Sequence, residues 1–427
     1  DTPSDWRTVS AALDAVVVDK LELEGVAPAP RSDDAEFLRR LYLDVVGTVP
    51  TPEEVEAFLG DRSRDKRASK IDELLGSEAY AENWATWWFR DLTGLSPHQG
   101  RVREGQGGRY VTGEGGKRFH AWLSEQMAAN RPYDEIAQDL IAATGRTDEN
   151  GAAGYMARWE GNANNMAGAV SKNFLGVQIQ CAQCHDHLYE DEWKQLDFKG
   201  MAAFFATTRP RRVPEYAELR KLRDQMNKKN AGKAKDAGDL RRPGKKGGAP
   251  DSMDGEMDGG MDGPSAGGSM DRAEVARKMR DLRKYANIVD VQDAKISARQ
   301  VQRMKMAMER GGRGGERARK LNPQQKERMA LMTVTPKFWM SAEATDVPGI
   351  PRRYLLARWV TSDENPYFAR ALANKLWGAL MGRGIVSPVD DFNSFNEPSH
   401  PKVLELLADD FRANGHDLMR TLRILLN

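Results

Sequence analysis

One long stretch of the chain, from about residue 228 to 271, has a composition that cannot form part of a packed core. Its first half (228–246) is basic, its second half (251–262) is acidic, and neither half contains an aromatic residue. A Met-Asp-Gly triplet recurs there, beginning at Met253, Met257 and Met261. Such a stretch buries too little apolar surface to offset the entropy lost when a chain becomes ordered. We therefore expect it to be disordered and to separate two folded parts of the chain.

The segments on either side show the spacing of helices rather than that of strands. Apolar residues recur every three to four positions, and few stretches alternate with a period of two. At 427 residues, the chain is also too long for one ordinary core. These observations predict a mainly α, multidomain fold. The predicted parts are an N-terminal helix (1–32), a helical unit (33–212), charged helical arms that carry the disordered tip (213–333) and a helical C-terminal unit (334–427).

Local signals place most of the helices. Thr51, Pro52 and Glu54 form a capping-box pattern, with a hydroxyl at the N-cap and a carboxylate three residues later. The glycine-rich stretch 100–116 is predicted to be a loop. The stretches 215–229 and 272–310 are predicted to be charged helical arms. Further helices are predicted over residues 5–23, 33–45, 64–75, 79–92, 119–129, 133–143, 167–180, 352–360, 367–381, 401–414 and 418–426.

The charge balance excludes two kinds of partner. Lys and Arg number 64 against 63 Asp and Glu, so the formal net charge is only +1. A chain with so small a net charge has no overall field to hold nucleic acid or an anionic membrane surface. No apolar run approaches the length of a membrane span. We therefore expect neither nucleic-acid binding nor a membrane span.

The sequence holds only two cysteines, and Cys181, Cys184 and His185 form a Cys-x-x-Cys-His motif. A chance arrangement of this kind is on the order of 1 in 10,000, and the pattern is that of c-type haem attachment. On one helical turn the three side chains share a face. Both sulfurs then form thioethers to the haem vinyl groups while His185 binds the iron from the same side. The sequence therefore predicts one covalently attached haem c at Cys181, Cys184 and His185.

Two other interpretations of the motif stay open. Cys181, Cys184, His185 and His187 are all permitted zinc ligands, although their close spacing strains a tetrahedral site. The two cysteines also suit a local disulfide or a thiol redox motif, although the βαβ context of a thioredoxin-like site is missing. Apolar residues that suit either a haem pocket or an ordinary core flank the motif: Phe174, Leu175, Val177, Ile179, Trp193, Phe198, Phe204 and Phe205.

A haem held by His185 has a second axial position. Met201 follows the motif in an apolar stretch and is the first choice for this ligand. Other choices are Met166, Met156 and His98, and an open or water-bound position is the alternative. His187 points away from His185 on a helix, so it cannot be the opposite ligand of the same iron. Its predicted functional roles are to contact a haem propionate, to orient a neighbouring group or to bind a separate metal, and an ordinary structural histidine is the alternative.

Two parts of the chain resemble known families of unknown function. Most of residues 33–210 is similar to the planctomycete-type cytochrome-like domain, and most of 334–427 is similar to the uncharacterised domain that usually follows it. The stretches that carry the resemblance are 37–44, 49–55 and 174–187 in the first part and 352–359, 365–370 and 382–392 in the second.

This resemblance implies export and a haem at Cys181, Cys184 and His185. Because c-type haem is attached outside the cytoplasmic membrane, we expect an extracytoplasmic protein that is periplasmic, on the cell surface or secreted. The start at Asp1 fits a processed or trimmed chain, and the end at Asn427 inside a predicted helix suggests a second domain that is cut short.

No enzyme signature is recognised in the sequence. The predicted role is therefore electron transfer or haem-based sensing, with a redox partner that the sequence does not identify. The competing class is a structural or scaffolding surface protein. Its charged arms would mediate self-assembly or bind other surface proteins, and its Cys/His cluster would bind zinc or another metal.

Overall fold

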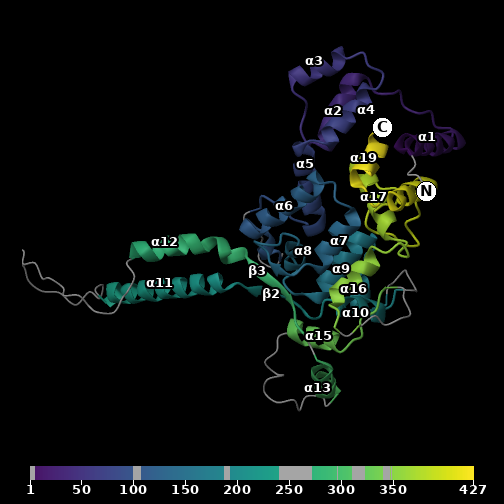
Figure 1. The fold of residues 1–427 in the computed structure, drawn as a ribbon. Helices are drawn as coiled ribbons and strands as arrows, with labels where there is room; N and C mark the ends of the chain where they lie inside the picture. The colour runs from purple at the N-terminus through teal and green to yellow at the C-terminus, as the bar shows by residue number, and fades with distance from the viewer. Residues whose placement is uncertain are drawn as a thin grey trace, which may run out of the picture. The chain divides into compact units, whose positions relative to one another are not determined.

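The computed structural model describes residues 5–99, 107–186, 193–239, 272–295, 297–309, 323–339, 347 and 349–427. These residues are mainly helical, with one small sheet (Figure 1). The predicted mainly α fold is confirmed. None of the helices in this described part combines the length and the apolar character that crossing a membrane requires.

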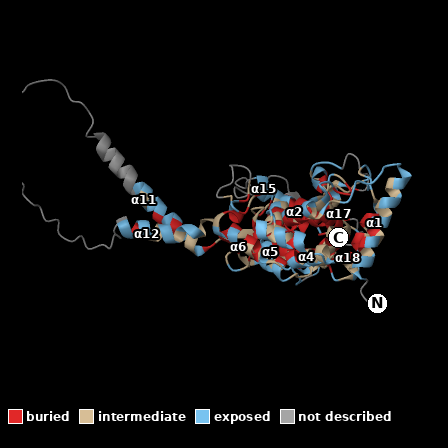
Figure 2. Cartoon of the chain, turned by 90° about the horizontal axis from the view of Figure 1, so that it is seen from above, coloured by how far each residue is buried: buried red, intermediate tan, exposed pale blue. Residues whose placement is uncertain are grey.

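Contacts within the chain define two compact units. The first comprises Asp1–Arg211 and Val289–Asn427, and the second comprises Arg212–Ile288. The C-terminal helices therefore belong to the same unit as the N-terminal ones. In this first unit the buried residues lie between the packed helices (Figure 2).

The N-terminal part of the first unit is a succession of helices whose starts follow local signals. The capping box is confirmed: Thr51 Oγ1 accepts from the Glu54 backbone N–H at 3.3 Å, and Glu54 Oε2 accepts from the Thr51 N–H at 2.8 Å. The elements are α1 (Trp6–Leu23), α2 (Asp34–Val45), α3 (Pro52–Gly60), α4 (Lys66–Leu75), α5 (Glu78–Thr93), the 3₁₀ turn η1 (Arg109–Val111), α6 (Gly113–Ala128) and α7 (Tyr133–Ala142).

The glycine-rich stretch is not a loop throughout its length, because α6 begins at Gly113 rather than near Phe119. The structure gives the reason for the glycine at position 116. A Cβ there would lie 2.4 Å from the carbonyl oxygen of Val111, so the helix approaches η1 more closely than any other residue permits. These glycines permit close packing at the start of the helix. The predicted loop residues 100–106 lie outside the described part.

A three-stranded sheet contains two strands from the middle of the chain and one strand, β3, from the block predicted to form charged helical arms (213–333). Its strand order is β1-β3-β2, and β1 (Gly145–Arg146) pairs antiparallel with β3 (Val289–Asp293). The prediction of a continuous helical arm over 272–310 is therefore wrong at β3, where Val289 and Val291 are buried. The remaining elements here are α8 (Ala153–Ala157), α9 (Ala163–Leu175), η2 (Ile179–Gln183), α10 (Gln195–Ala203) and β2 (Thr208–Arg212).

The second unit contains two long helices that pack against each other, α11 (Pro214–Asp239) and α12 (Arg272–Leu282), followed by η3 (Arg283–Asn287). Both helices are largely exposed where their burial is described (Figure 2). They share a narrow buried apolar seam of Leu219, Leu222 and Val275. The disordered tip predicted over 228–271 is wrong at its start, because α11 continues to Asp239. The rest of that tip, residues 240–271, lies outside the described part.

The C-terminal helices pack directly on the N-terminal ones. In the first unit, α16 contacts α7, α17 contacts α9, and both α18 and α19 contact α1. Arg353 of α16 is 1% exposed and pairs with Asp293 of β3 at 2.8 Å, so α16 is also tied to the sheet. The helices are α13 (Ala298–Glu309), α15 (Pro323–Met332), α16 (Arg352–Val360), α17 (Phe368–Met381), α18 (Pro401–Ala413) and α19 (Leu418–Leu426).

Candidate functional site

The Cys-x-x-Cys-His motif lies on a short 3₁₀ turn and not at the end of a long helix. The predicted helix 167–180 is wrong at its end, because α9 stops at Leu175 and Gly176 adopts a left-handed conformation with φ 66°. Cys181 lies in η2, and Cys184 directly follows that turn. The motif therefore begins in a 3₁₀ helix and ends beyond it, so it does not lie on an α-helical turn.

The three reactive side chains of this turn are accessible. Both cysteines are free and exposed, and His185 is exposed as well. Two apolar residues of the same turn, Ile179 and Ala182, are each only 2% exposed. The turn is thus anchored in the core by one set of side chains, while both sulfurs and the imidazole remain open to a group from outside.

The imidazole of His185 has one nitrogen engaged by the backbone. Its Nδ1 lies 2.6 Å from the carbonyl oxygen of Asp186. A carbonyl oxygen only accepts, so Nδ1 is the nitrogen that carries the proton in this arrangement. The lone pair of a neutral imidazole then resides on Nε2, which is the form that binds a metal, and such a second bond orients the ring.

Gln195, the first residue of α10, holds the turn from the opposite side. Its side-chain Nε2 donates to the carbonyl oxygens of Cys184 at 2.8 Å and Gln183 at 3.3 Å. Its backbone N–H donates to Asp186 Oδ1 at 2.8 Å. Sequence reasoning missed Gln195. A glutamine eleven residues beyond Cys184 carries no local signal of such a contact.

The apolar residues that flank the motif are part of the core. Trp193 packs edge-on against Trp339, with ring centroids 5.1 Å apart, and Phe204 stacks on Phe338 at 5.3 Å. In the structure these residues pack against other side chains of the core. Each of the flanking residues is at most 5% exposed: Phe174, Leu175, Val177, Ile179, Trp193, Phe198, Phe204 and Phe205.

The residues suggested as the second axial ligand lie in different surroundings. Met201 of α10 has no exposed surface, and neither do Met156 and Met166. His98 is exposed, and its ring centroid lies 6.3 Å from that of His120. His187 lies outside the described residues. Cys181, Cys184 and His185 are thus exposed in or directly after one 3₁₀ turn, whereas the three methionines lie in the core.

The described part of the chain omits residues 187–192, directly after the motif. Within the described residues, no group of three or more His, Cys, Asp or Glu side chains is arranged to hold a metal ion.

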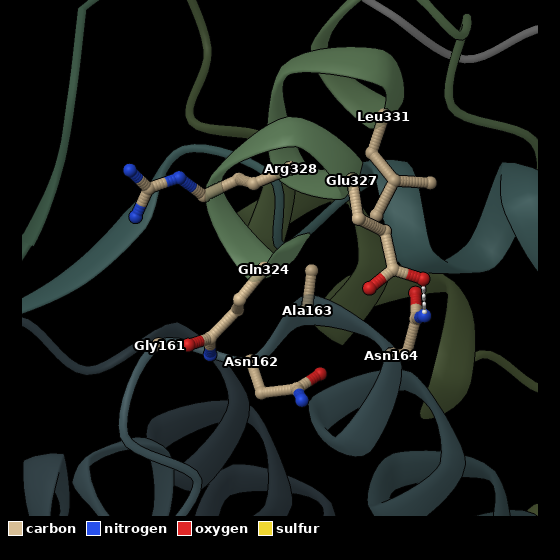
Figure 3. A pocket seen from close by; sticks show the side chains of 8 residues that line it. All are labelled: Gly161, Asn162, Ala163, Asn164, Gln324, Glu327, Arg328 and Leu331. Carbon is tan, nitrogen blue, oxygen red and sulfur yellow. Dashed lines mark hydrogen bonds between the residues drawn. The ribbon is translucent and has the colours of Figure 1, made fainter. Parts of the chain in front are cut away.

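A separate small pocket lies between the start of α9 and α15 (Figure 3). Its volume is about 180 Å³, including space open to solvent. Asn164 donates to Glu327 Oε1 at 2.5 Å, while the Arg328 guanidinium extends to the opposite side. Its lining contains none of the motif residues: Gly161, Asn162, Ala163, Asn164, Gln324, Glu327, Arg328 and Leu331.

Comparison with family models finds two matches. Residues 12–210 match PSCyt2, described as a protein of unknown function (DUF1549), and residues 352–427 match PSD1, described as a protein of unknown function (DUF1553). The chain carries a PSCyt2 region followed by a PSD1 region. The predicted pairing of the two domains is thereby confirmed. The PSCyt2 region contains the Cys-x-x-Cys-His motif, and the PSD1 region begins at Arg352, the first residue of α16.

No curated protein matches the chain, and no solved structure does.

Proposed function

We propose that this chain is an exported protein that carries one c-type haem at Cys181, Cys184 and His185 and acts in electron transfer or haem-based sensing. One observation carries the proposal: two free thiols and an imidazole are exposed within residues 181–185, in η2 and directly after it. The His185 ring supports it further, because its Nδ1 faces a carbonyl oxygen and leaves Nε2 for the iron.

Each residue of the turn has a defined part in this proposal. Cys181 and Cys184 would hold a haem through thioether bonds, and the His185 imidazole would bind its iron. Gln195 keeps the turn in place through its bonds to the Cys184 and Gln183 carbonyl oxygens. When bound, a haem supplies a one-electron couple that protein side chains lack.

The surroundings of the turn bear on the second axial position. Because the apolar flanking residues pack in the core, a group attached at the exposed turn would have at least one face near solvent. Met201 reaches such a group only if α10 repacks, since its side chain is fully buried. An open or water-bound position is therefore the arrangement we favour, with Met201 as the alternative.

Export follows from the chemistry of attachment, because c-type haem is joined to its protein outside the cytoplasmic membrane. We accordingly propose a periplasmic, cell-surface or secreted location. The redox partner is not identified by any feature of the chain.

A second candidate function is that of a structural or scaffolding surface protein. It is favoured by the burial of the apolar flanking residues, which leaves a small Cys/His cluster at the surface. Cys181, Cys184, His185 and His187 would then bind zinc or another metal. The charged helices α11 and α12 would mediate assembly.

Spectroscopy of the chain, exported from a bacterial host that attaches c-type haem, tests the proposal. The reduced protein should show the α and Soret bands of haem c, and the colour should stay with the protein after extraction with acidic acetone. The double variant Cys181→Ser/Cys184→Ser should lose this retention. His185→Ala should alter the spectrum, whereas His400→Ala, a partly exposed histidine hydrogen-bonded to Ser399, should not. A colourless protein that contains zinc would overturn the proposal in favour of the scaffold.

A further inference from the structure

The three residues that lead into the cysteine turn, Gly176 to Gln178, are in contact with a loop of the PSD1 region. The carbonyl oxygen of Gly176 accepts from the Phe392 backbone N–H at 2.8 Å. The Gln178 side chain donates to Asp390 Oδ1 at 3.2 Å. Residues more than two hundred positions apart in the sequence therefore meet directly before Cys181.

Asp390 makes a second contact that ties this segment to the preceding helix. Its Oδ2 lies 2.9 Å from the ammonium group of Lys172, in the last turn of α9. The Asp390 side chain is 21% exposed and that of Lys172 is 44% exposed. One carboxylate thus bridges the end of α9 and the extended segment that follows it, and its two oxygens have different partners.

The loop that carries Asp390 is itself fixed by a buried side chain. Asn374 of α17 has no exposed surface and makes three hydrogen bonds to that loop. It accepts from the Val386 N–H at 2.9 Å and donates to the carbonyl oxygens of Val386 and Val389 at 2.9 and 2.8 Å. Because a buried amide with its bonds satisfied holds a single conformation, Asp390 is presented from a rigid support.

We propose that Asp390 is a positioning residue of the Cys-x-x-Cys-His site, so that the PSD1 region completes the site carried by the PSCyt2 region. Asp390 acts by holding Gln178 and Lys172, and through them the turn that carries Cys181. This inference rests on the proposed function for the identity of the group attached there, but its structural content can be measured without that group.

Hydrogen exchange of the unloaded full chain tests the structural content. In Asp390→Ala, the backbone amides of residues 176–185 should exchange about tenfold faster than in the wild type. The free energy of local opening is lower in this variant, because the Asp390 contacts are already absent. Asp390→Asn should fall between the two, since its amide oxygen still accepts from Gln178. Lys172→Met removes only the ion pair at a half-exposed position, so it should also fall between them and gives a readout if Asp390→Ala does not fold.

Asp391→Ala is the matched control. Asp391 is the next residue, and its carboxylate accepts from Asn396 within the same loop at 3.1 Å. In Asp391→Ala, the backbone amides of residues 176–185 should exchange at the same rate as in the wild type. Equal exchange rates in Asp390→Ala, Lys172→Met and the wild type would overturn the proposal, as would equal acceleration by Asp390→Ala and Asp391→Ala.

Loaded protein gives the second readout. Asp390→Ala should lower the fraction of chain that carries haem and lower its midpoint potential, because a looser turn admits water around the iron. Asp391→Ala should change neither value, and an unchanged potential in Asp390→Ala would contradict a positioning role. If the wild type takes up no haem, the proposed function fails, while the exchange comparison still decides whether Asp390 holds the turn.

Discussion

Lys375 of α17 and Asp91 of α5 form an ion pair of 2.8 Å that joins the PSD1 region to the core of the PSCyt2 region. The Lys375 side chain is 3% exposed and that of Asp91 is 23% exposed, so the ammonium group has little access to water. A buried charge is stable only with a partner. The two regions are therefore joined by mutual charge neutralisation as well as by apolar packing.

Removing one member of this pair should be costly. Lys375→Met is expected to lower the free energy of unfolding by about 2 kcal/mol, because the Asp91 carboxylate, 23% exposed, is left without a counter-charge. The double variant Lys375→Met/Asp91→Leu should recover most of this loss. Urea unfolding of the wild type, Lys375→Met, Asp91→Leu and the double variant measures both effects. Additive losses would show that the two charges are independent.

The close approach of Gly176 and Phe392 predicts a second effect on stability. A Cβ on Gly176 would lie 2.7 Å from the Phe392 ring, and the residue has φ 66°. Gly94 has φ 68°, but a Cβ there meets nothing within 4 Å, so it serves as the control. Gly94→Ala should cost about 1 kcal/mol from backbone strain alone. Gly176→Ala should cost roughly 1–3 kcal/mol more from the clash.

Thermal or urea unfolding of the two alanine variants measures this difference. Equal losses in Gly94→Ala and Gly176→Ala would mean that the PSD1 loop moves aside without cost, which would contradict a rigid contact at Gly176.

The capping box of α3 should make a pH-dependent contribution to the free energy of unfolding. The backbone N–H of Thr51 lowers the pKa of the Glu54 carboxyl below its usual value, and the Tyr42 and Thr51 side chains add to this. The contribution is therefore fully present above the pKa of an unfolded glutamate, about 4.3, and is lost as the pH falls through the folded pKa. Glu54→Ala, which removes the carboxylate that accepts from the Thr51 N–H, should cost about 1 kcal/mol at pH 7 and less in acid. A cost that is constant from pH 7 to pH 3 would contradict this account.

His120 should give a pH dependence near neutrality. It is 8% exposed, its Nε2 lies 2.9 Å from Thr86 Oγ1, and its Nδ1 lies 3.7 Å from Glu82 Oε1. Burial lowers the pKa of His120, Glu82 raises it, and His98 lowers it further, with a net shift downward. The unfolded chain then binds more protons below about pH 6.5, so stability should decrease as the pH falls from there towards the folded pKa.

His120→Gln should remove this step in stability, and Glu82→Gln should enlarge it, because Glu82 opposes the downward shift. Unfolding free energies measured from pH 8 to pH 5 test both outcomes. A step of the same size in His120→Gln and the wild type would assign the titration to another group.

Features set by neighbouring residues could be predicted from the sequence. The helices Arg352–Val360 and Leu418–Leu426 have the predicted bounds, and the capping box at Thr51 forms as expected. Each depends on apolar spacing or on a side chain three residues away. The motif residues Cys181, Cys184 and His185 are likewise a local pattern, and all three are exposed in or directly after η2.

Features set by distant residues could not be predicted. The 3₁₀ turn replaces the end of a predicted helix because Gly176 turns the chain against Phe392, which lies in the C-terminal part. Strand β3 forms within the charged block because Val291 pairs with Gly145. Nothing in the local sequence indicates that Gln195 donates to the Cys184 carbonyl oxygen or that Gln178 donates to Asp390. Each of these contacts joins residues that are brought close only by folding, so the contact is identified only from the folded structure.

The intact mass of the exported chain, measured under denaturing conditions, tests the central claim most directly. Its two cysteines are the only thiols in the chain, so thioether attachment at any cysteine must involve the motif. The proposal predicts that the wild type is heavier than its polypeptide by the mass of one haem, and that Cys181→Ala/Cys184→Ala has the mass of the polypeptide alone. A wild-type chain that is unmodified after export from a host able to attach c-type haem would contradict the account.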